Sequence, residues 1–204
     1  MIPKFDHEVT DVIQLIDRQK IHILYDSGIG VYHAMNIGLS QAHYTHVLFL
    51  NTGDLIIASQ QLKYCLSEIE KNPSRSYILP IEASWSSLLT NCLPDLRSFI
   101  AGDEGYYVSH QGVLFLTTFV TQEGRFDVRF KIAADLKQLC SLYYTKNYSI
   151  LNLRLVSIEY PKISSKFNRR GRFESIIVAI YSLRGLMRIK AIANRLRMEL
   201  RTQF

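Results

Sequence analysis

Apolar positions along the chain recur in two spacings, one typical of helices and the other of strands. Helical spacing predicts helices over residues 9–18, 32–42, 62–69 and 132–144. Short apolar runs predict strands at 21–24, 45–50, 77–81 and 113–119, and residues 149–158 are rich in β-forming types. Strands that alternate with helices imply an α/β protein with a mostly parallel sheet. Residues 84–107 show no clear period, and we expect a flexible insertion there.

The apolar run at 45–50 ends abruptly in Asn51-Thr52-Gly53-Asp54. A carboxylate after a buried strand lies where open α/β sheets place ligand chemistry, and Gly53 allows the sharp turn. A lone acid there suits a hard, oxygen-bound cation such as Mg²⁺ or Mn²⁺, shared with a substrate phosphate. The alternative is an ordinary turn aspartate.

The composition is that of a soluble globular protein with one domain and a tail. The chain has 204 residues, of which 48% are hydrophobic and 21% charged. Cys65, Cys92 and Cys140 are odd in number and widely spaced, which fits neither a disulfide framework nor a zinc site, so we expect reduced, mostly buried thiols. The sequence has no N-terminal apolar run, so we expect no signal peptide. It also has no stretch of ~20 apolar residues that could span a membrane. These features predict a cytoplasmic protein.

The net charge of +6 is concentrated in the C-terminal part of the chain. From residue 161 onward eleven Lys and Arg stand against two acids, near +9, whereas the remainder has thirteen bases and sixteen acids, near −3. We therefore divide the chain into a body, residues 1–160, and a basic helical tail, residues 161–204. We expect one face of the tail helix to be apolar, formed by Ile176, Ile180, Leu183 and Met187.

Two interpretations of this tail stay open. The helix either packs on the body with a solvated basic face, or residues 166–201 bind an anionic membrane surface. Aromatic residues are sparse among the bases, so we expect no nucleic-acid partner.

Two motifs in register resemble a known family. The first is Gly30-Val31-Tyr32-His33-Ala34-Met35-Asn36 with Gly38, and the second is Phe49-Leu50-Asn51-Thr52-Gly53-Asp54. They resemble the D-x-G-I-Y-D-A-M-N-K-G and F-L-N-S-G-D motifs of the inverting family-2 glycosyltransferases of the GT-A fold, in particular the bacterial polysaccharide-biosynthesis type. Weaker matches occur at residues 109–115, 126–135 and 163–165, so the resemblance spans about residues 20 to 166.

The resemblance implies a GT-A-like (Rossmann-like) sheet flanked by helices and a single inverting displacement. The resemblance implies a nucleotide-sugar donor, UDP-linked, and as acceptor a saccharide or lipid-linked molecule in cell-surface polysaccharide biosynthesis. Such a protein would lie in the cytoplasm, at the inner face of the cell membrane. Asp54 would hold Mg²⁺ or Mn²⁺ as the only acid of its motif, because Thr52 stands at the first-acid position of D-x-D. Asp135 would be the general base that takes the acceptor proton.

Further substrate contacts are implied for Gly30, Tyr32, Asn36, Asn51, and the pair His110 and Gln111. Each has a plainer alternative: glycines as turn formers, Asn36 as a brace of nearby backbone, His110 and Gln111 as a polar pair at a strand start. Asp135 likewise has the alternative of a helix N-terminal acid favoured by the dipole.

The chain departs from the family in two respects. Members begin with a strand-helix-strand unit that holds the nucleotide base, and this sequence starts beyond it, so we expect an N-terminally truncated domain. His33 stands where the family usually has Asp. The second hypothesis is therefore a catalytically inactive remnant or a non-catalytic partner subunit.

Overall fold

The computed structural model describes residues 24–26, 28–57, 59–83, 94–158 and 168–201. Its helices, including the short 3-10 turn η2, are α2 (Val31–Ser40), α3 (Ser59–Lys71), α5 (Leu96–Ala101), η2 (His110–Gly112), α6 (Thr117–Gln122), α7 (Ala134–Thr145), α9 (Asn168–Ser182) and α10 (Gly185–Arg201). Its strands are β1 (His46–Val47), β2 (Leu55–Ile56), β3 (Ser76–Ile78), β4 (Glu82–Ala83), β5 (Val113–Leu116), β6 (Tyr148–Ile150) and β7 (Val156–Ile158). The predicted helix at 9–18 and all but the last residue of the strand at 21–24 lie outside the described residues.

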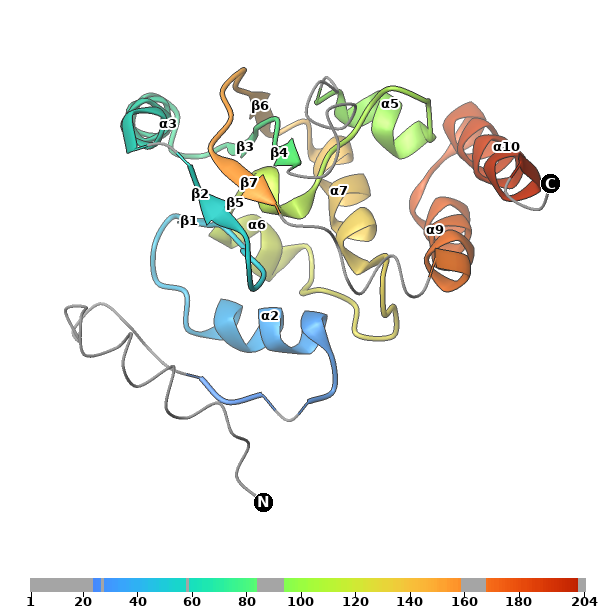
Figure 1. Cartoon of the computed structure of the whole chain (residues 1–204), viewed down its shortest axis with the longest axis horizontal. Helices are drawn as coiled ribbons and strands as arrows, with labels where there is room; N and C mark the ends of the chain where they lie inside the picture. The colour runs from blue at the N-terminus through green and yellow to red at the C-terminus, as the bar shows by residue number, and fades with distance from the viewer. Residues whose placement is uncertain (1–23, 27, 58, 84–93, 159–167, 202–204) are drawn as a thin grey trace.

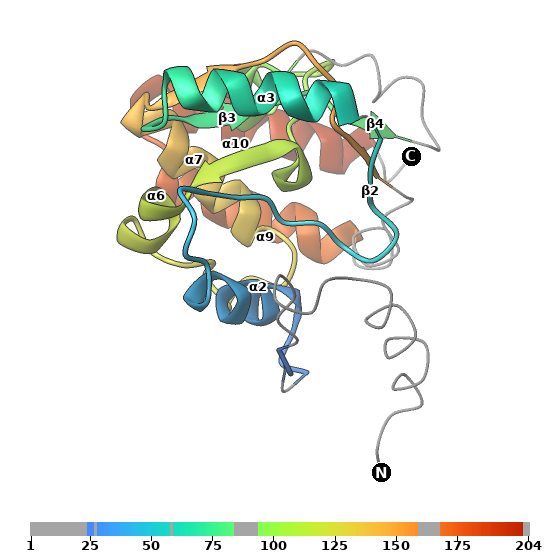
Figure 2. The same ribbon diagram turned by 90° about the vertical axis from the view of Figure 1, so that its left-hand side faces the viewer.

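Two small sheets form the centre of the molecule (Figure 1). One has the strand order β1-β5-β3-β6 and the other β2-β7-β4. Helix α2 lies below the strands in both views, and α3 lies above them in Figure 2, while α7 packs against β6, α5 and α9. The architecture is therefore mixed α/β, with helices on both sides of the strands.

The strands are less parallel than the sequence predicted. β3 is parallel to β6 and β4 to β7, but β5 is antiparallel to both β1 and β3, and β2 is antiparallel to β7. The reversal at β5 has a local cause. The chain leaves β3 through Leu79 and re-enters through Gly112, whose carbonyl oxygen accepts the Leu79 N–H at 2.8 Å. A strand that enters a sheet where its neighbour leaves must run the opposite way, so the parallel prediction is confirmed only in part.

The region predicted to be a flexible insertion contains a helix. In α5, Asp95 Oδ1 accepts the Ser98 N–H at 2.6 Å and caps the first turn, and Leu96 and Ile100 are buried. The prediction is wrong for this helix because six residues are too few to show a helical period, while residues 84–93 lie outside the described part. The predicted strand at 45–50 is a strand only at β1.

Buried side chains form two hydrophobic groups on opposite faces of the central strands. Phe115 and Ile78 belong to the larger group with the helices α2, α5, α6, α7, α9 and α10, whereas their neighbours Leu114 and Tyr77 belong to the smaller group with α3 and β7. Successive side chains of a strand point to opposite faces, so β3 and β5 are covered on both sides.

Two of the three cysteines lie in this core as free thiols. Burial raises the pKa of Cys65 to about 11 and that of Cys140 to about 12, so both stay protonated at neutral pH. This agrees with the expectation of buried, reduced thiols, while Cys92 lies outside the described residues.

The basic tail consists of two helices that dock on the body. α9 packs against α7, and α10 packs against both α9 and α5 (Figure 1). The predicted apolar face is wrong in its membership: Leu183 follows the end of α9 and is buried, whereas Ile180 is exposed. Val178, Ala179 and Ala191 join Leu183 as the buried apolar side chains of the tail helices and their connection. In the described part of the chain, no helix is long and apolar enough to cross a bilayer.

Candidate functional site

Three segments that are far apart in the sequence meet at Asp135, in the first turn of α7. The Tyr32 hydroxyl of α2 lies 3.0 Å from Asp135 Oδ1, and His110 Nδ1 of η2 lies 3.1 Å from Asp135 Oδ2. The Asp135 side chain is still 26% exposed. Both oxygens are thus held from within the fold while the carboxylate stays open to a bound molecule.

Tyr32 supports this carboxylate from below. Its side chain is buried, its ring stacks on Phe126, and its hydroxyl also lies 2.5 Å from the Ile132 carbonyl oxygen. Burial first, and the Asp135 charge second, raise the pKa of Tyr32 well above its ordinary value. The phenol therefore remains a donor, and its position fits a brace of Asp135 better than the direct substrate contact predicted from the sequence.

His110 is the second support of Asp135 and keeps one unused polar atom. The residue is 8% exposed, and Nε2 is buried with no hydrogen-bond partner among the described residues. If Nδ1–H donates to Asp135, Nε2 is left as an acceptor. Buried polar atoms are normally paired, so Nε2 is a candidate contact for a ligand or a water molecule.

Asp54 lies on the turn after the 45–50 segment, as predicted. Its Oδ2 accepts the Asn51 N–H at 2.7 Å and the Gln111 side-chain amide at 3.2 Å, while its own N–H donates to the Asn51 carbonyl at 3.0 Å. Gly53 has φ 97°, a left-handed conformation that favours glycine and closes this turn. The amide of Gln111 is oriented in turn, since its Oε1 accepts the Ser109 hydroxyl.

The short turn η2 connects the two carboxylates. His110 contacts Asp135 and the next residue, Gln111, contacts Asp54. Gly112 holds this turn against β3, because a Cβ there would lie 2.5 Å from the Leu79 carbonyl oxygen. With Tyr32, which contacts Asp135, six of the predicted site residues belong to one connected network: Tyr32, Asn51, Asp54, His110, Gln111 and Asp135.

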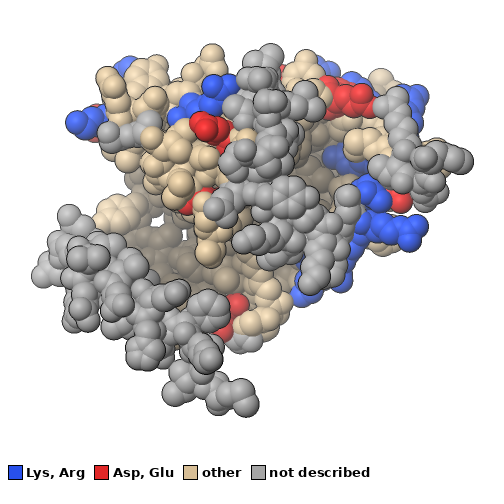
Figure 3. Space-filling model, viewed as in Figure 1, with Lys and Arg blue, Asp and Glu red and all other residues tan. Residues whose placement is uncertain are grey.

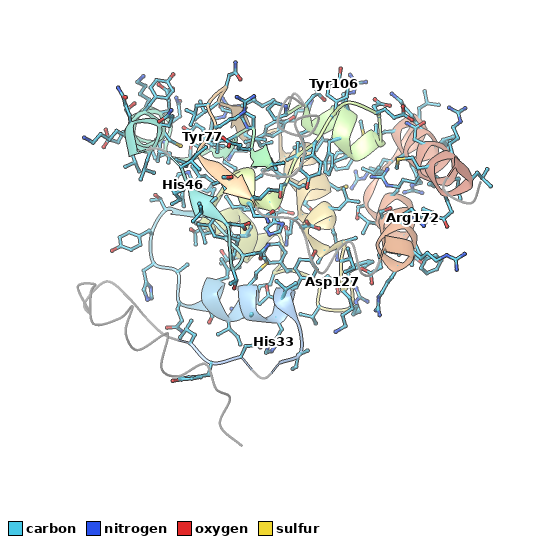
Figure 4. The ribbon with its side chains drawn as sticks, viewed as in Figure 1. His33, His46, Tyr77, Tyr106, Asp127 and Arg172 are labelled. Atoms are coloured by element: carbon cyan, nitrogen blue, oxygen red, sulfur yellow. The ribbon has the colours of Figure 1, made fainter. Side chains whose placement is uncertain are left out.

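The remaining predicted residues lie around α2. Asn36 exchanges two hydrogen bonds with the Phe126 backbone, at 2.8 and 2.9 Å, so it braces a segment distant in sequence rather than its own loop. Gly30 precedes α2 with φ 141° and its carbonyl accepts the His33 N–H at 3.0 Å. His33, which Figure 4 labels on α2, pairs with Asp26 at 2.6 Å. Neither Asn36 nor His33 contacts the Asp54–Asp135 network.

Sequence reasoning missed Glu174, which positions the segment before Asp135. This α9 carboxylate is buried, and its oxygens accept the successive N–H groups of Lys131, Ile132 and Ala133 at 2.8–3.1 Å. Arg170, one turn earlier, donates to it at 2.7 Å. In the sequence, Glu174 is one of two acids in the basic tail, and the charge pattern predicts no further role for it. The Arg170–Glu174 spacing of four was a signal for an ion pair, but nothing in the sequence showed where the carboxylate points.

A cavity of about 270 Å³ opens beside Asp135, between the start of α7 and α9. It is lined by Ile132, Ala133, Asp135, Leu136, Gly171, Arg172 and Ser175. Arg172, labelled in Figure 4, forms an ion pair with Glu199 of α10. The cavity gives a bound molecule access to the Asp135 carboxylate.

The donor set at Asp54 fits a cation shared with a ligand rather than one held by protein alone. Within the described ranges, no group of three or more His, Cys, Asp or Glu side chains is placed to hold a metal. Asp54 Oδ2 is engaged as described, whereas no hydrogen bond to Oδ1 is recorded there. Mg²⁺ typically takes one or two carboxylate oxygens and completes its coordination with phosphate and water, which Oδ1 permits.

No protein-family model and no curated protein sequence matches the chain. Solved structures do match it. S. aureus TarS superposes with a TM-score of 0.65 at 16% identity, over 95% of this chain and 35% of the TarS chain. S. aureus TarS 1-349 matches with a TM-score of 0.63 at 15% identity over 98% of this chain and 60% of that one.

TarS 1-349 in complex with UDP gives a TM-score of 0.61 at 16% identity, over 95% of this chain and 58% of the other. At these identities the comparison shows that the chain shares the TarS fold. The chain spans about a third of the longer TarS chain and about three fifths of TarS 1-349.

Proposed function

We propose that the protein is a glycosyltransferase that moves a sugar from a UDP-linked donor to a saccharide or lipid-linked acceptor with inversion. The observation that carries the proposal is the η2 turn, which connects Asp54 to Asp135 through the neighbouring side chains Gln111 and His110. An inverting transfer needs a donor-phosphate site and a base near one another, and this network supplies a candidate for each. The shared fold with TarS, one structure of which is a UDP complex, supports the nucleotide part.

Asp135 is proposed to act as the general base. It accepts the proton of the acceptor hydroxyl while that oxygen forms a bond to the anomeric carbon of the donor sugar. The bond from the anomeric carbon to the diphosphate oxygen breaks, and UDP leaves with the electron pair. Tyr32 Oη and His110 Nδ1 lie 3.0 and 3.1 Å from the two oxygens of the carboxylate and hold it in place, and the cavity at Arg172 and Ser175 is where the acceptor would enter.

Asp54 is proposed to act at the donor diphosphate. Gln111 and Asn51 hold its Oδ2 and so direct Oδ1 to a ligand. Mg²⁺ or Mn²⁺ bound there would neutralise the charge of the leaving diphosphate. Gln111 acts in this scheme as a positioning residue.

The decisive measurement is calorimetric titration of the protein with UDP, with and without Mn²⁺. We expect binding that depends on Mn²⁺ and is lost in Asp54→Asn, which keeps an acceptor oxygen for the Asn51 N–H. Asp103→Asn is the matched control, because Asp103 is also half-buried and hydrogen-bonded but pairs with Lys190 of α10. A protein that fails to bind UDP under both conditions would refute the proposal and favour a non-catalytic partner subunit.

The outward face of α10 supports association with an anionic membrane surface. Leu186, Ile189, Leu196 and Leu200 recur at helical spacing and are 84, 65, 48 and 59% exposed. Arg188 and Arg197 are exposed on the same helix, and its one acid, Glu199, is paired with Arg172. Apolar side chains with basic neighbours are typical of helices that lie on anionic bilayers. We therefore propose a peripheral position at the membrane, through a different face from the one the sequence suggested.

A further inference from the structure

A second and larger cavity lies on the other side of α9 from the Asp135 cavity. It has a volume of about 780 Å³ and lies between α9 and the residues from Asp127 to Lys137. Phe130, Phe173, Ile177 and Tyr181 form its apolar wall. Phe173 and Tyr181 are 64 and 81% exposed, so a large apolar surface on this wall is open to a bound molecule, as in ligand pockets lined by aromatic side chains. We call this cavity the α9 groove.

Both acids of the α9 groove are already fully engaged. Asp127 accepts from Arg129 Nη2 at 2.7 Å, Arg129 Nε at 2.9 Å and Lys137 Nζ at 2.8 Å. Hydrogen bonds from Arg129, the largest influence, hold the pKa of Asp127 well below its ordinary range although burial alone would raise it. Glu174 accepts Arg170 and the three backbone N–H groups described above. These carboxylates have little capacity left to accept hydrogen bonds from a ligand.

The cations that neutralise these acids still have donors to spare. Arg129, Arg170 and Lys137 are 82, 51 and 41% exposed. Arg170 gives its carboxylate only Nε, Arg129 gives Nε and one Nη, and Lys137 gives one of three ammonium protons. The charged groups that the groove offers to a ligand are therefore cationic donors. Figure 3 shows Lys and Arg side chains on this side of the molecule, and Figure 4 places Asp127 on the loop before α7.

We propose that the α9 groove binds an anionic amphiphile. A phosphate or carboxylate head would accept from Arg129, Arg170 and Lys137, and a hydrocarbon chain would lie on the wall of Phe173, Ile177 and Tyr181. A neutral saccharide fits less well, because its hydroxyl groups would need acceptors that Asp127 and Glu174 no longer provide. The site is separate from the Asp54–Asp135 network and requires neither UDP nor transfer activity.

The probe is dodecyl phosphate, titrated calorimetrically into the full chain below its critical micelle concentration. Dodecyl maltoside carries the same hydrocarbon chain without the charge, and inorganic phosphate carries the charge without the hydrocarbon chain. We expect dodecyl phosphate to bind at least about tenfold more tightly than either, since a charge-assisted hydrogen bond alone contributes that much. Equal binding of dodecyl maltoside, or of inorganic phosphate, would overturn the proposal.

Substitutions at exposed positions locate the binding without disturbing the fold. Arg129→Gln and Tyr181→Ser should each weaken dodecyl phosphate binding by roughly tenfold. Their controls are Arg97→Gln on α5 and Tyr64→Ser on α3, both exposed and outside the groove, which should change the affinity for dodecyl phosphate by less than about twofold. If the groove variants bind like the controls, the site is not the groove.

Two competing sites are tested with the same reagents. Dodecyl phosphate that is displaced by saturating UDP and Mn²⁺ would belong to the donor site, which overturns the groove assignment. If the protein binds vesicles of anionic lipid but does not bind monomeric dodecyl phosphate, the interaction belongs to the membrane-facing α10. This result would also overturn the groove proposal. Failure of UDP to bind leaves the result for the groove unaffected, so the two proposals fail separately.

Discussion

At the scale of single residues, the contacts that the Asp135 oxygens already make determine from where a substrate can approach this carboxylate. Tyr32 and His110 each take one lone-pair direction, and Leu136 N donates to Oδ1 as well. These partners restrict the directions left for a substrate, and Asp135 lines the cavity next to α9. A carboxylate held in this way needs little reorganisation when an acceptor hydroxyl arrives.

Asp135→Asn should therefore abolish transfer while leaving the donor site intact. The amide keeps the size of the side chain but cannot take a proton, and loss of a general base typically lowers the rate by 10²–10⁴-fold. UDP affinity should stay within about twofold, since the substitution leaves the proposed donor contacts at Asp54 unchanged. Rates are measured as UDP released in the presence of acceptor, beside Asp103→Asn as the control. Transfer by Asp135→Asn at the wild-type rate would assign the base elsewhere.

At the scale of elements, the sequence was informative about helices and less so about how strands connect. α2, α3 and α7 lie where apolar spacing predicted them, because each buries one stripe of side chains along several turns. The antiparallel course of β5 depends on where the chain re-enters the sheet at Gly112, which periodicity does not record. The position of Glu174 under residues 131–133 likewise depends on packing between segments more than forty residues apart in the sequence.

Gly112→Ala should destabilise the protein because the new methyl group would approach the Leu79 carbonyl oxygen to 2.5 Å. Forcing η2 away from β3 should lower the free energy of unfolding by about 1–3 kcal/mol. Gly38→Ala is the matched control, because that position in α2 is open and alanine is the better helix former by roughly 0.5–1 kcal/mol. Urea unfolding measures the stability of both variants. A neutral Gly112→Ala would mean that η2 is free to shift.

Glu174 should make stability depend on acidic pH. Burial, the largest influence, would raise its pKa, but hydrogen bonds from Arg170 and from the backbone of residues 131–133 outweigh it, so the pKa of Glu174 lies below its ordinary value. A lowered pKa stabilises the folded state above the ordinary value, near pH 4.3, and this stabilisation is lost as the pH falls through the folded-state pKa.

Glu174→Gln should accordingly cost roughly 2 kcal/mol of unfolding free energy at pH 7, with the difference from wild type shrinking below about pH 4. Urea titrations at several pH values measure this. Glu68→Gln is the control, because Glu68 forms an exposed pair with Lys71 and should change stability by less than about 1 kcal/mol. A Glu174→Gln cost that is constant down to pH 3 would contradict the assigned role.

At the scale of the whole molecule, the charge imbalance was visible in the sequence but its arrangement was not. The sequence separates a basic tail from a slightly acidic body, yet the tail packs on that body through α7 and α5. Arg195 shows why the face could not be predicted: this basic residue is buried and donates to the Ile100 and Ala191 carbonyls. Leu186, Leu196 and Leu200 are exposed instead, whereas leucine is usually buried and arginine usually exposed.

Co-sedimentation with vesicles tests the outward face of α10. Binding to vesicles with anionic lipid, absent with neutral lipid and lost at high salt, is expected, since each basic residue near such a surface contributes about 1 kcal/mol. Leu186→Ser with Ile189→Ser should abolish it, whereas Tyr64→Ser on α3 should not. If the double variant binds the vesicles as strongly as the wild type, the outward face of α10 is not the membrane-binding surface.

Under the proposed function, the η2 turn would make the two ends of the site thermodynamically dependent on each other. One residue of the turn contacts Asp135 and the next contacts Asp54, so a ligand that shifts or rigidifies the turn from one end alters the affinity at the other. Such coupling is reciprocal: if UDP tightens acceptor binding by some factor, the acceptor must tighten UDP binding by the same factor. Whichever of the two substrates binds second would then find the turn already rigid and lose less conformational entropy, so a glycine-anchored turn of three residues would favour the complex that holds both substrates at once.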